Sequence, residues 1–567
     1  MSSRSIVTLS TLLVAAVYGQ QIGTNTPEVN PPLLWEECTL PGLCRKVNGS
    51  VTLDANWRWT HNIGGYSNCK NGNTWNTTFC PDPTTCAENC AVEGVDYASS
   101  GVYTSGNALT LTLNTVTNSG PRLYLLAADQ KTYQAFMLNQ QEFAFDVDLS
   151  QVACGMNAAL YFSEMDAHGG NAATNKAGAK YGTGYCDAQC PSGDNFFNGQ
   201  ANIANNGICC NEMDIWEANR ISNAFTTHGC LENGPYTCSG AGCQGQCDGN
   251  GCAFNAFHQG APQFYGPGLT IDTTKKFTVV TQFLTNNGGT SGQLNEIRRL
   301  YVQNGRVHQT PATKVTGMPP FNSISQPFCD AQRKIMNATN LFDETGGMQP
   351  LNNAFKTGMV LVFSLWDDPY GGMTWLDGPG AGTCTGGLDT SGGPSVNVTF
   401  SNIKFGNIAL VKDIDNERAS DSSKFSISLV AQVMISSSMP AWYITVARWI
   451  ETQERGSEYT PHLLSVSTYI IGHKMINSVF CAPRSSKNFV VLADQSYCRK
   501  EPTRTQLLLA VSFVTTNPIF IQVVSEEACT TSNAHSSCPI FGGTSGKKDM
   551  PSSALFSFGV LLPHLSL

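Results

Sequence analysis

Charged residues are scarce in this sequence. Lys and Arg number 33 and Asp and Glu 42 among 567 residues, which is 13% of the chain, and the formal net charge is −9. Nucleic acids and anionic bilayers are bound mainly by clustered cations. The shortage of basic residues therefore argues against a nucleic acid or a membrane as the partner.

The sequence also lacks a long, uninterrupted apolar run. The nearest candidate, LLLAVSFVTTNPIFIQVV from Leu507, is broken by Thr, Asn, Pro and Gln. A shorter apolar run, residues 6–17, follows Arg4 and ends at Val17-Tyr18-Gly19. This order is typical of a secretory signal peptide cleaved before Gln20. We therefore expect residues 1–19 to be removed and the product to be soluble, secreted and extracellular.

Cysteine, in contrast, is abundant. The chain has 22, of which 18 precede residue 411. In an oxidising compartment this even number predicts about nine disulfides. A structural zinc site at Cys186/Cys190 or Cys243/Cys247 is a weaker alternative in a secreted chain. Asn-x-Ser/Thr sequons, which predict N-glycosylated surface loops, occur at Asn48, Asn76, Asn337 and Asn397.

Amphipathic helical patterns are few between residues 20 and 410. Instead, short runs with period-two alternation are separated by clusters of Gly, Asn, Thr and Ser. The clearest runs are LTLTL (109–113), FAFDVDL (143–149), FTVVTQF (277–283), MVLVFSLW (359–366) and VNVTFSNIKF (396–405). Many spaced strands with Gly-rich loops predict an all-β sandwich or jelly roll.

Three of the few carboxylates stand close together in CCNEMDIWEANR (209–220). In a strand, Glu212 and Asp214 share a face, whereas Glu217 has the opposite parity. One extra residue in a β-bulge would restore that parity, and bulges often re-aim side chains beside active sites. The glutamate carboxyls could then approach to about 5–5.5 Å, which suits double displacement at a sugar carbon. We expect Asp214 to hydrogen-bond Glu212, and like-charge repulsion to raise the pKa of the acid.

The same string of acids also fits a solvated face or a calcium-binding loop. However, the apolar residues Met213, Ile215 and Trp216 alternate with the acids, and the adjacent pair Cys209-Cys210 would anchor the start of the strand. A solvated face does not require such anchoring. We therefore prefer the catalytic interpretation.

CCNEMDIWEAN resembles the active-site strand of the glycoside hydrolase family 7 cellulases, in which Glu-x-Asp-x-x-Glu follows a Cys-Cys pair. Other similar segments, in family order, are LDANWRWTH (53–61), GNTWNTTFCPDPTTCAENC (72–90), EFAFDVDLS (142–150), AGAKYGTGYCDAQCP (177–191), DTTKKFTVVTQF (272–283), GMVLVFSLWDD (358–368) and VTFSNIKFG (398–406). The resemblance implies a large concanavalin-like jelly roll with long, disulfide-stapled loops and an open substrate cleft. It also implies a monomer that needs no cofactor and no metal.

The resemblance assigns roles to the acids by position. Glu212 matches the nucleophile, Glu217 the acid/base and Asp214 the residue that orients the nucleophile. His228, in THGC, matches a supporting histidine on the acid/base side. Taken alone, a histidine near a cysteine is more often structural, so this role rests on the resemblance.

Glucan sites bind the apolar faces of sugar rings with aromatic side chains and the hydroxyls with polar groups. Most Trp residues of a sandwich lie in its core, but several here match sugar-binding positions. The implied substrate-binding residues are Trp57, Trp59, Arg122, Tyr161, Tyr185, Asp187, Gln189, Trp366 and Trp375. The strict alternation of Tyr185, Asp187 and Gln189 is what a strand facing the cleft would show.

Loop lengths favour one branch of the family. Residues 191–208 resemble the shortened form found in endoglucanases, and only residues 244–246 separate two cysteines where tunnel-forming cellobiohydrolases carry a longer loop. Residues 378–383 lack the arginine of the tunnel formers, and Asn250 replaces their aspartate. We therefore expect a retaining endo-1,4-β-glucanase that hydrolyses internal bonds of cellulose or another β-1,4-glucan.

Two alternatives to this function remain open. One is a cellobiohydrolase of the same family, which releases cellobiose from chain ends. The other is a non-catalytic lectin on the same sandwich, which would normally have lost Glu212 or Glu217. Loop tips decide the preference among cellulose, mixed-linkage glucan and xylan.

Family analogy also implies a disulfide pattern that cysteine spacing alone does not provide. The implied pairs are Cys38–Cys44, Cys69–Cys90, Cys80–Cys86, Cys154–Cys384, Cys186–Cys210, Cys190–Cys209, Cys230–Cys247, Cys238–Cys243 and Cys252–Cys329. The crossed pairs at Cys209-Cys210 would anchor the strand that carries the acids to the Tyr185–Gln189 segment.

We divide the chain into a signal peptide (1–19), a family 7 catalytic domain (20–410) and an unassigned tail (411–567). The tail follows no Ser/Thr/Pro-rich linker and contains no recognisable cellulose-binding module. It could be a small β-rich domain, with Cys481, Cys498, Cys529 and Cys538 forming two disulfides. Its end loosely resembles a glycolipid-anchor signal, although Pro563-His564 interrupts the apolar part. We favour a third origin, translated non-coding sequence, because the resemblance to the family stops at the point where family catalytic domains end.

A chain that ends near Gly406 is therefore expected to keep full activity on soluble glucan. The reason is that every family segment precedes that point. Specific activity and thermal unfolding of the shortened and full-length proteins test this expectation. Loss of folding or activity would show that the tail belongs to the enzyme, and tail peptides in the mass spectrum of the purified protein would contradict the non-coding origin.

Overall fold

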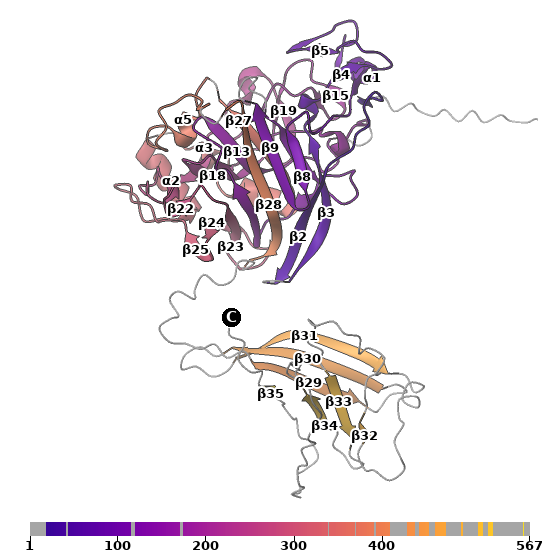
Figure 1. Ribbon diagram of the computed structural model, residues 1–567, viewed down its shortest axis with the longest axis vertical. Coiled ribbons are helices and arrows are strands. Elements are labelled where there is room, and N and C mark those ends of the chain that lie inside the picture. The colour runs from indigo at the N-terminus through magenta and orange to yellow at the C-terminus, as the bar shows by residue number, and fades with distance from the viewer. Residues whose placement is uncertain are drawn as a thin grey trace, which may run out of the picture. The chain divides into compact units, whose positions relative to one another are not determined.

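The computed structural model describes residues 19–40, 43–114, 120–170, 174–337, 339–368, 370–390 and 393–408, together with seven strands further along the chain. The chain divides into two compact units, Met1–Ile414 and Asp415–Leu567 (Figure 1). The predicted signal peptide lies outside the described residues except for Gly19, which precedes Gln20.

The first unit contains a large β structure made of two groups of paired strands. In the first group, consecutive neighbours are β20 (Cys252–Asn255), β18 (Asn223–His228), β17 (Glu212–Ala218), β13 (Met156–Ser163), β27 (Met359–Asp367), β10 (Arg122–Leu126) and β3 (Leu43–Leu53), with β11 (Ala135–Phe136) also on β27. These pairings are antiparallel, so the strand that carries the acids lies between β13 and β18.

The second group of strands forms the other half of the structure. Its neighbours are β8 (Val102–Ser105), β9 (Ala108–Asn114), β28 (Ser395–Asn407), β12 (Gln141–Asp148), β23 (Phe277–Thr285), β24 (Leu294–Gln303) and β25 (Arg306–Gln309), with β26 (Ser323–Ile324) also on β24. Strand β2 (Pro32–Leu40) joins the groups because it pairs antiparallel with β3 and parallel with β28.

Apolar side chains of both groups meet in one core. Met213, Ile215 and Trp216 of β17 belong to the same cluster as Phe145 of β12 and Tyr301 of β24. Burial of alternate residues follows the period-two pattern. Along β9, Leu109, Leu111 and Leu113 are buried, whereas Thr110 and Thr112 between them are half-buried. The predicted all-β sandwich is therefore confirmed, and each sequence run named above lies in a strand except for Leu149, which follows the end of β12.

Shorter elements extend the loops of this unit. The remaining strands are β1 (Gln21–Ile22), β4 (Thr60–Asn62), β5 (Lys70–Asn71), β6 (Thr74–Trp75), β7 (Cys90–Val92), β14 (Phe196–Phe197), β15 (Gln200–Ala201), β16 (Gly207–Cys209), β19 (Tyr236–Cys238), β21 (Tyr265–Gly266) and β22 (Ile271–Asp272). The helices are α1 (Pro83–Asn89), α2 (Gln326–Met336), α3 (Leu341–Glu344), α4 (Gln349–Thr357) and α5 (Thr374–Asp377), with 3-10 turns at Ala55–Trp57, Ala179–Tyr181 and Gly240–Cys243. Among the described residues, no helix is both long and apolar enough to cross a membrane.

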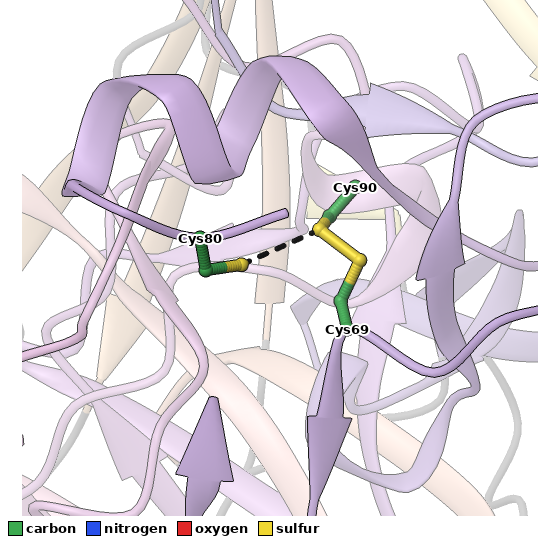
Figure 2. Close-up of side chains that lie close together, drawn as sticks. All are labelled: Cys69, Cys80 and Cys90. Atoms are coloured by element: carbon green, nitrogen blue, oxygen red, sulfur yellow. Dashed lines mark hydrogen bonds between the residues drawn. A yellow bond between two sulfur atoms is a disulfide. The ribbon is translucent and has the colours of Figure 1, made fainter. Parts of the chain in front are cut away.

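All nine predicted disulfides are present, with the predicted partners. The zinc alternative at Cys186/Cys190 or Cys243/Cys247 is therefore wrong, because these thiols are oxidised. Sulfur atoms of different bridges also pack together: the Sγ of Cys80 lies 3.5 Å from the Sγ of Cys90, which is bonded to Cys69 (Figure 2).

The second unit contains two further sheets. One has the order β31 (Thr460–Ile471), β30 (Trp442–Thr452), β29 (Ser428–Ser436) and β35 (Gly559–Val560), and the other has the order β32 (Phe489–Val490), β33 (Leu508–Phe513) and β34 (Phe520–Val524). The four tail cysteines lie outside the described residues. In the first unit, β28 runs to Asn407, so a shortened chain with this strand intact ends beyond that residue.

Candidate active site

Strand β17 contains the predicted bulge. Against β13, Leu160 pairs with Trp216 and Phe162 with Met213, so the single residue between them on β13 faces two residues on β17. The register with β18 shifts between Asp214 and Glu217 in the same way. One extra residue therefore lies between the two glutamates, and the bulge prediction is confirmed.

The bulge changes which face of the strand each side chain occupies. Ile215 and Trp216 are consecutive, yet both are buried in the core. Glu212, Asp214 and Glu217 therefore all lie on the opposite face, where they line one cavity. Without the extra residue, Glu217 would point into the apolar core.

A buried arginine supports the bulge from the core side. Arg299 of β24 is fully buried, and its guanidinium donates a hydrogen bond to the carbonyl of Ile215. Its Cζ lies 4.6 Å from the centre of the Phe225 ring and 5.7 Å from that of Trp216. Burial lowers the pKa of Arg299. The carbonyl of Ile215 thus gains a donor, at the cost of burying a cation.

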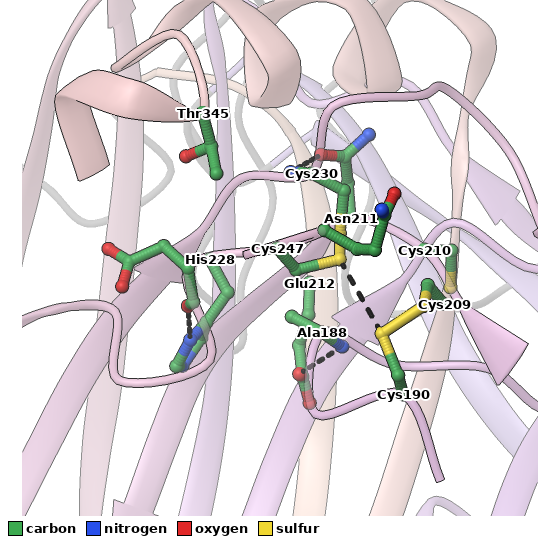
Figure 3. The surroundings of a disulfide bond; sticks show 12 residues. Ala188, Cys190, Cys209, Cys210, Asn211, Glu212, His228, Cys230, Cys247 and Thr345 are labelled. Atoms are coloured by element: carbon green, nitrogen blue, oxygen red, sulfur yellow. Dashed lines mark hydrogen bonds between the residues drawn. A yellow bond between two sulfur atoms is a disulfide. The ribbon is translucent and has the colours of Figure 1, made fainter. Parts of the chain in front are cut away.

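Two crossed disulfides hold the start of β17, as predicted. Cys186–Cys210 and Cys190–Cys209 tie it to the segment that precedes it. The bridge Cys230–Cys247 lies beside them, with the Sγ of Cys247 4.0 Å from that of Cys190 (Figure 3). This packing fixes the backbone that leads into Glu212.

The Glu212 carboxylate is buried and accepts a hydrogen bond of 3.0 Å from the backbone N–H of Ala188 (Figure 3). Burial raises the pKa of Glu212 well above its usual value, and the nearby charges of Asp214 and Asp187 raise it further. The Ala188 N–H opposes this shift by favouring the carboxylate.

Asp214 forms an ion pair with His228, a contact that the sequence did not predict. The Nε2 of His228 lies 2.8 Å from Oδ2 of Asp214, and its Nδ1 lies 2.8 Å from the carbonyl oxygen of Asp248. A carbonyl only accepts, so Nδ1 must carry a proton. Burial lowers the pKa of His228, but the hydrogen bond to Asp214 and the charges of Asp214 and Glu217 outweigh this effect and raise it to about 9.

Glu217 is half-buried, and its Oε1 accepts a hydrogen bond of 3.0 Å from Asn157 of β13. Burial and the negative charge of Asp214 raise the pKa of Glu217 to about 8, although His228 and Asn157 act in the opposite direction. Glu217 therefore holds a proton at neutral pH and can donate it.

The cavity above the acids has a volume of about 780 Å³. Every predicted site residue except Trp59 lines it, together with Asn250, Asn255, His258 and Ser364. The indoles of Trp57, Trp366 and Trp375 are 42%, 39% and 49% exposed, so their faces are available to a ligand. Trp59 instead stacks on His61, with ring centres 4.1 Å apart, outside this cavity.

Polar residues of the cavity wall form a connected chain. The hydroxyls of Tyr161 and Tyr185 lie 2.8 Å apart, and Tyr185 donates to Asp187 at 2.7 Å. The guanidinium of Arg122 packs on the Tyr185 ring, 3.4 Å from its centre, and donates to Asp54 at 2.7 Å. Such fixed donors and acceptors suit the hydroxyls of a neutral ligand.

One group at this site has the composition of a metal site. Ligand atoms of Glu212, Asp214 and His228 lie within 4.8 Å of one another. However, Nε2 of His228 bonds Asp214 and Nδ1 donates to the carbonyl of Asp248, so both ring nitrogens already have partners. These residues therefore fit acid–base chemistry better than metal binding.

Comparison with known proteins agrees with this geometry. The model of "Glycosyl hydrolase family 7" matches residues 22–410. The chain belongs to this family. Similar solved structures are a family 7 cellobiohydrolase from Daphnia pulex (40% identity, 69% of this chain and 100% of that chain, TM-score 0.66) and an endocellulase from Humicola insolens (39%, 68% and 99%, 0.63). A cellobiohydrolase from Melanocarpus albomyces, in complex with cellotetraose, is also similar (40%, 69% and 99%, 0.61).

Membership of family 7 makes the protein a glycosidase of a cellulase family. The similar structures include both cellobiohydrolases and endoglucanases at comparable identity, so they do not distinguish between these modes of action.

Sequence reasoning missed Asn157, Asp248, Arg299 and His258. For Asn157 a signal existed, because it shares strand parity with Ala159 and Tyr161, which line the cavity. For Asp248 and Arg299 no local signal existed, because each acts through a contact with a segment distant in sequence.

The raised pKa of Glu217 predicts a pH-dependent stability. The unfolded chain releases this proton above pH 4.5, whereas the folded protein retains it to about pH 8, so stability falls as the pH rises through this interval. We expect Glu217→Gln to unfold at a higher temperature than the wild type, by a margin that grows from pH 5 to pH 8. Thermal unfolding across this range measures it, with the exposed Glu344→Gln as control. A constant or shrinking margin contradicts the prediction.

Proposed function

We propose that the protein is a secreted endo-1,4-β-glucanase that hydrolyses internal bonds of cellulose and related β-glucans with retention of anomeric configuration. The observation that carries the hydrolytic role is the bulged strand, which places Glu212 and Glu217 on one wall of an aromatic-lined cavity. Secretion is supported by the N-terminal leader pattern and the nine disulfides.

The reaction would proceed in two displacements. The Glu212 carboxylate attacks the anomeric carbon and the glycosidic C–O bond breaks, while Glu217 gives its proton to the departing oxygen. In the second step Glu217, now ionised, takes a proton from water. The resulting hydroxide attacks the anomeric carbon and releases the Glu212 carboxylate, with the sugar in its original configuration.

The electrostatics of the site support these roles. A carboxyl with a pKa of about 8 keeps its proton until the leaving group needs it. The N–H of Ala188 and the His228 cation favour the ionised form of the neighbouring carboxylates, which the nucleophile requires. Asp214 would thus position the cation of His228 between the two glutamates.

The β-glucan substrate is supported by the cavity and by the relatives. Three exposed indole faces suit the C–H faces of glucose rings. One similar endoglucanase is described in complex with cellobiose and one cellobiohydrolase with cellotetraose. Short loops at residues 191–208 and 244–246 support internal attack, because little chain is available to roof the cavity.

Internal attack is tested by following the viscosity of carboxymethylcellulose against the release of reducing sugar. An endoglucanase reduces viscosity strongly for each new reducing end, since cuts fall within chains. A small fall in viscosity, with cellobiose as the dominant product, would instead establish the cellobiohydrolase alternative.

Glu212→Gln is expected to reduce kcat by roughly 10³-fold or more while glucan binding persists, because the nucleophile is lost with little change in volume. Glu217→Gln is expected to slow cello-oligosaccharide hydrolysis by roughly 10²- to 10⁴-fold but to spare aryl glycosides, whose leaving groups need little protonation.

Steady-state kinetics on both substrate types, with Glu344→Gln as the exposed control, measures these effects. Normal activity of Glu212→Gln, or inverted configuration of the fresh product by NMR, would rule out the mechanism.

A further inference from the structure

The turn at residues 248–251 encloses the ring of His228. Its first residue, Asp248, accepts the hydrogen bond from Nδ1 through its backbone carbonyl. Its last residue, Gly251, has a φ of +63° and packs against the same ring. A Cβ at Gly251 would lie 2.5 Å from Cε1 and 2.7 Å from Nδ1 of His228. The backbone of this turn is therefore shaped to the imidazole, and a shift in the turn would move the ring.

The turn is closed by its own hydrogen bonds and by flanking disulfides. The N–H of Gly251 lies 3.0 Å from the carbonyl oxygen of Asp248 and 3.1 Å from its Oδ1. The adjoining residues Cys247 and Cys252 are bonded to Cys230 and Cys329. These bonds fix the ends of the turn, but they leave the Gly251 carbonyl and the second carboxylate oxygen of Asp248 to other contacts.

Arg333 of α2 makes those contacts. Its NH2 group donates to the carbonyl of Gly251 and lies 3.5 Å from both carboxylate oxygens of Asp248. The Asp248 side chain is fully buried and that of Arg333 is 9% exposed. Cys329 stands one helical turn earlier, so one face of α2 holds the turn by both a disulfide and a guanidinium.

Stability alone does not account for this arginine. A buried ion pair generally stabilises a fold no more than apolar residues of the same size, because both charges must be desolvated. An ion pair does, however, fix the orientation of the groups that it joins. The guanidinium bonds both the first and the last residue of the turn, which are the two residues that contact the His228 ring.

We propose that Arg333 is a positioning residue of the hydrolytic site, which holds the ring of His228, and through it the Asp214 ion pair, in place between the two glutamates. This role rests on the proposed function. Arg333 does not line the cavity and acts only through Asp248 and Gly251.

The expected consequence of losing Arg333 is a chemical defect without a binding defect. The charged groups around His228 are Glu212, Asp214 and Glu217 on β17, with the Asp248–Arg333 pair on the side of the turn. If the ring tilts away, the charge of Asp214 is no longer neutralised beside Glu212. The nucleophile then holds its proton to higher pH, and less of the enzyme is active. The tryptophans of the cavity lie outside the turn, so KM should change far less than kcat, although Gly249 and Asn250 of the turn line the cavity.

The test compares Arg333→Met, Arg333→Lys and the control Lys334→Met, which removes an exposed cation one residue away on the same helix. The full chain is assayed on a soluble cello-oligosaccharide, and rates are normalised to folded protein. For Arg333→Met we expect kcat to fall about tenfold, the effect of losing one hydrogen bond to a charged donor, with KM within about twofold. The acidic limb of its pH–rate profile should move to higher pH, and Arg333→Lys should recover part of the loss.

An Arg333→Met enzyme with the kcat and the acidic limb of the wild type would overturn the proposal, as would a lower unfolding temperature with unchanged kcat per folded molecule. If this variant does not fold, Arg333→Gln replaces it, because it keeps a donor for Gly251 and removes the charge; the same split between kcat and KM is expected. A wild type with no activity on glucan would overturn the proposed function itself, whereas unchanged variants of an active enzyme would overturn only the positioning role.

Discussion

A single inserted residue in β17 is the constraint on which the site depends. A strand presents alternate residues to one face, and the spacing of Glu212 and Glu217 places them on opposite faces unless one residue is added. The bulge adds it, with Ile215 and Trp216 both turned to the core. A bulge disrupts the ladder locally, and here Arg299, from the other half of the sandwich, donates a hydrogen bond to the carbonyl of Ile215. The position of Glu217 therefore depends on a buried cation that the core would not otherwise contain.

The same strand concentrates negative charge in a buried space, and the surrounding structure compensates for it. Two like charges about 4 Å apart repel by roughly 4 kcal/mol at an effective dielectric constant of 20. Three ionised carboxylates would thus be unstable together. The fold provides one cation, His228 on Asp214, and one proton, which Glu217 retains to a pKa of about 8. For Glu212 the N–H of Ala188 favours the carboxylate form, against the raised pKa that burial and the charges of Asp214 and Asp187 give it.

Much of the fold could be predicted from the sequence because its signals are local. Period-two alternation identified strands such as β9, β12 and β27, and the parity conflict at Glu217 required a bulge. The disulfide partners came from family resemblance, since spacing alone allows many pairings. The ion pair between Asp214 and His228 was not predicted, because the two residues lie on neighbouring strands and are far apart in the sequence. The roles of Arg299 and Arg333 could not be predicted from a local pattern. Arg299 of β24 donates to the carbonyl of Ile215, and Arg333 of α2 donates to that of Gly251, and both carbonyls lie more than a full element away in the sequence.

The scarcity of charge also has a functional meaning. A neutral polysaccharide offers no charge to attract, and it is suited by aromatic faces such as those of Trp57, Trp366 and Trp375, which line the cavity, and by hydrogen bonds to its hydroxyls. Extra charges along the cavity would be costly to desolvate and would perturb the pKa values of the acids. Even Arg122 is neutralised by Asp54 and covered by the Tyr185 ring. Among the described residues that line the cavity, the charged groups without a full partner are thus confined to the acids of β17, close to the anomeric carbon, where a glycosidase reaction develops charge.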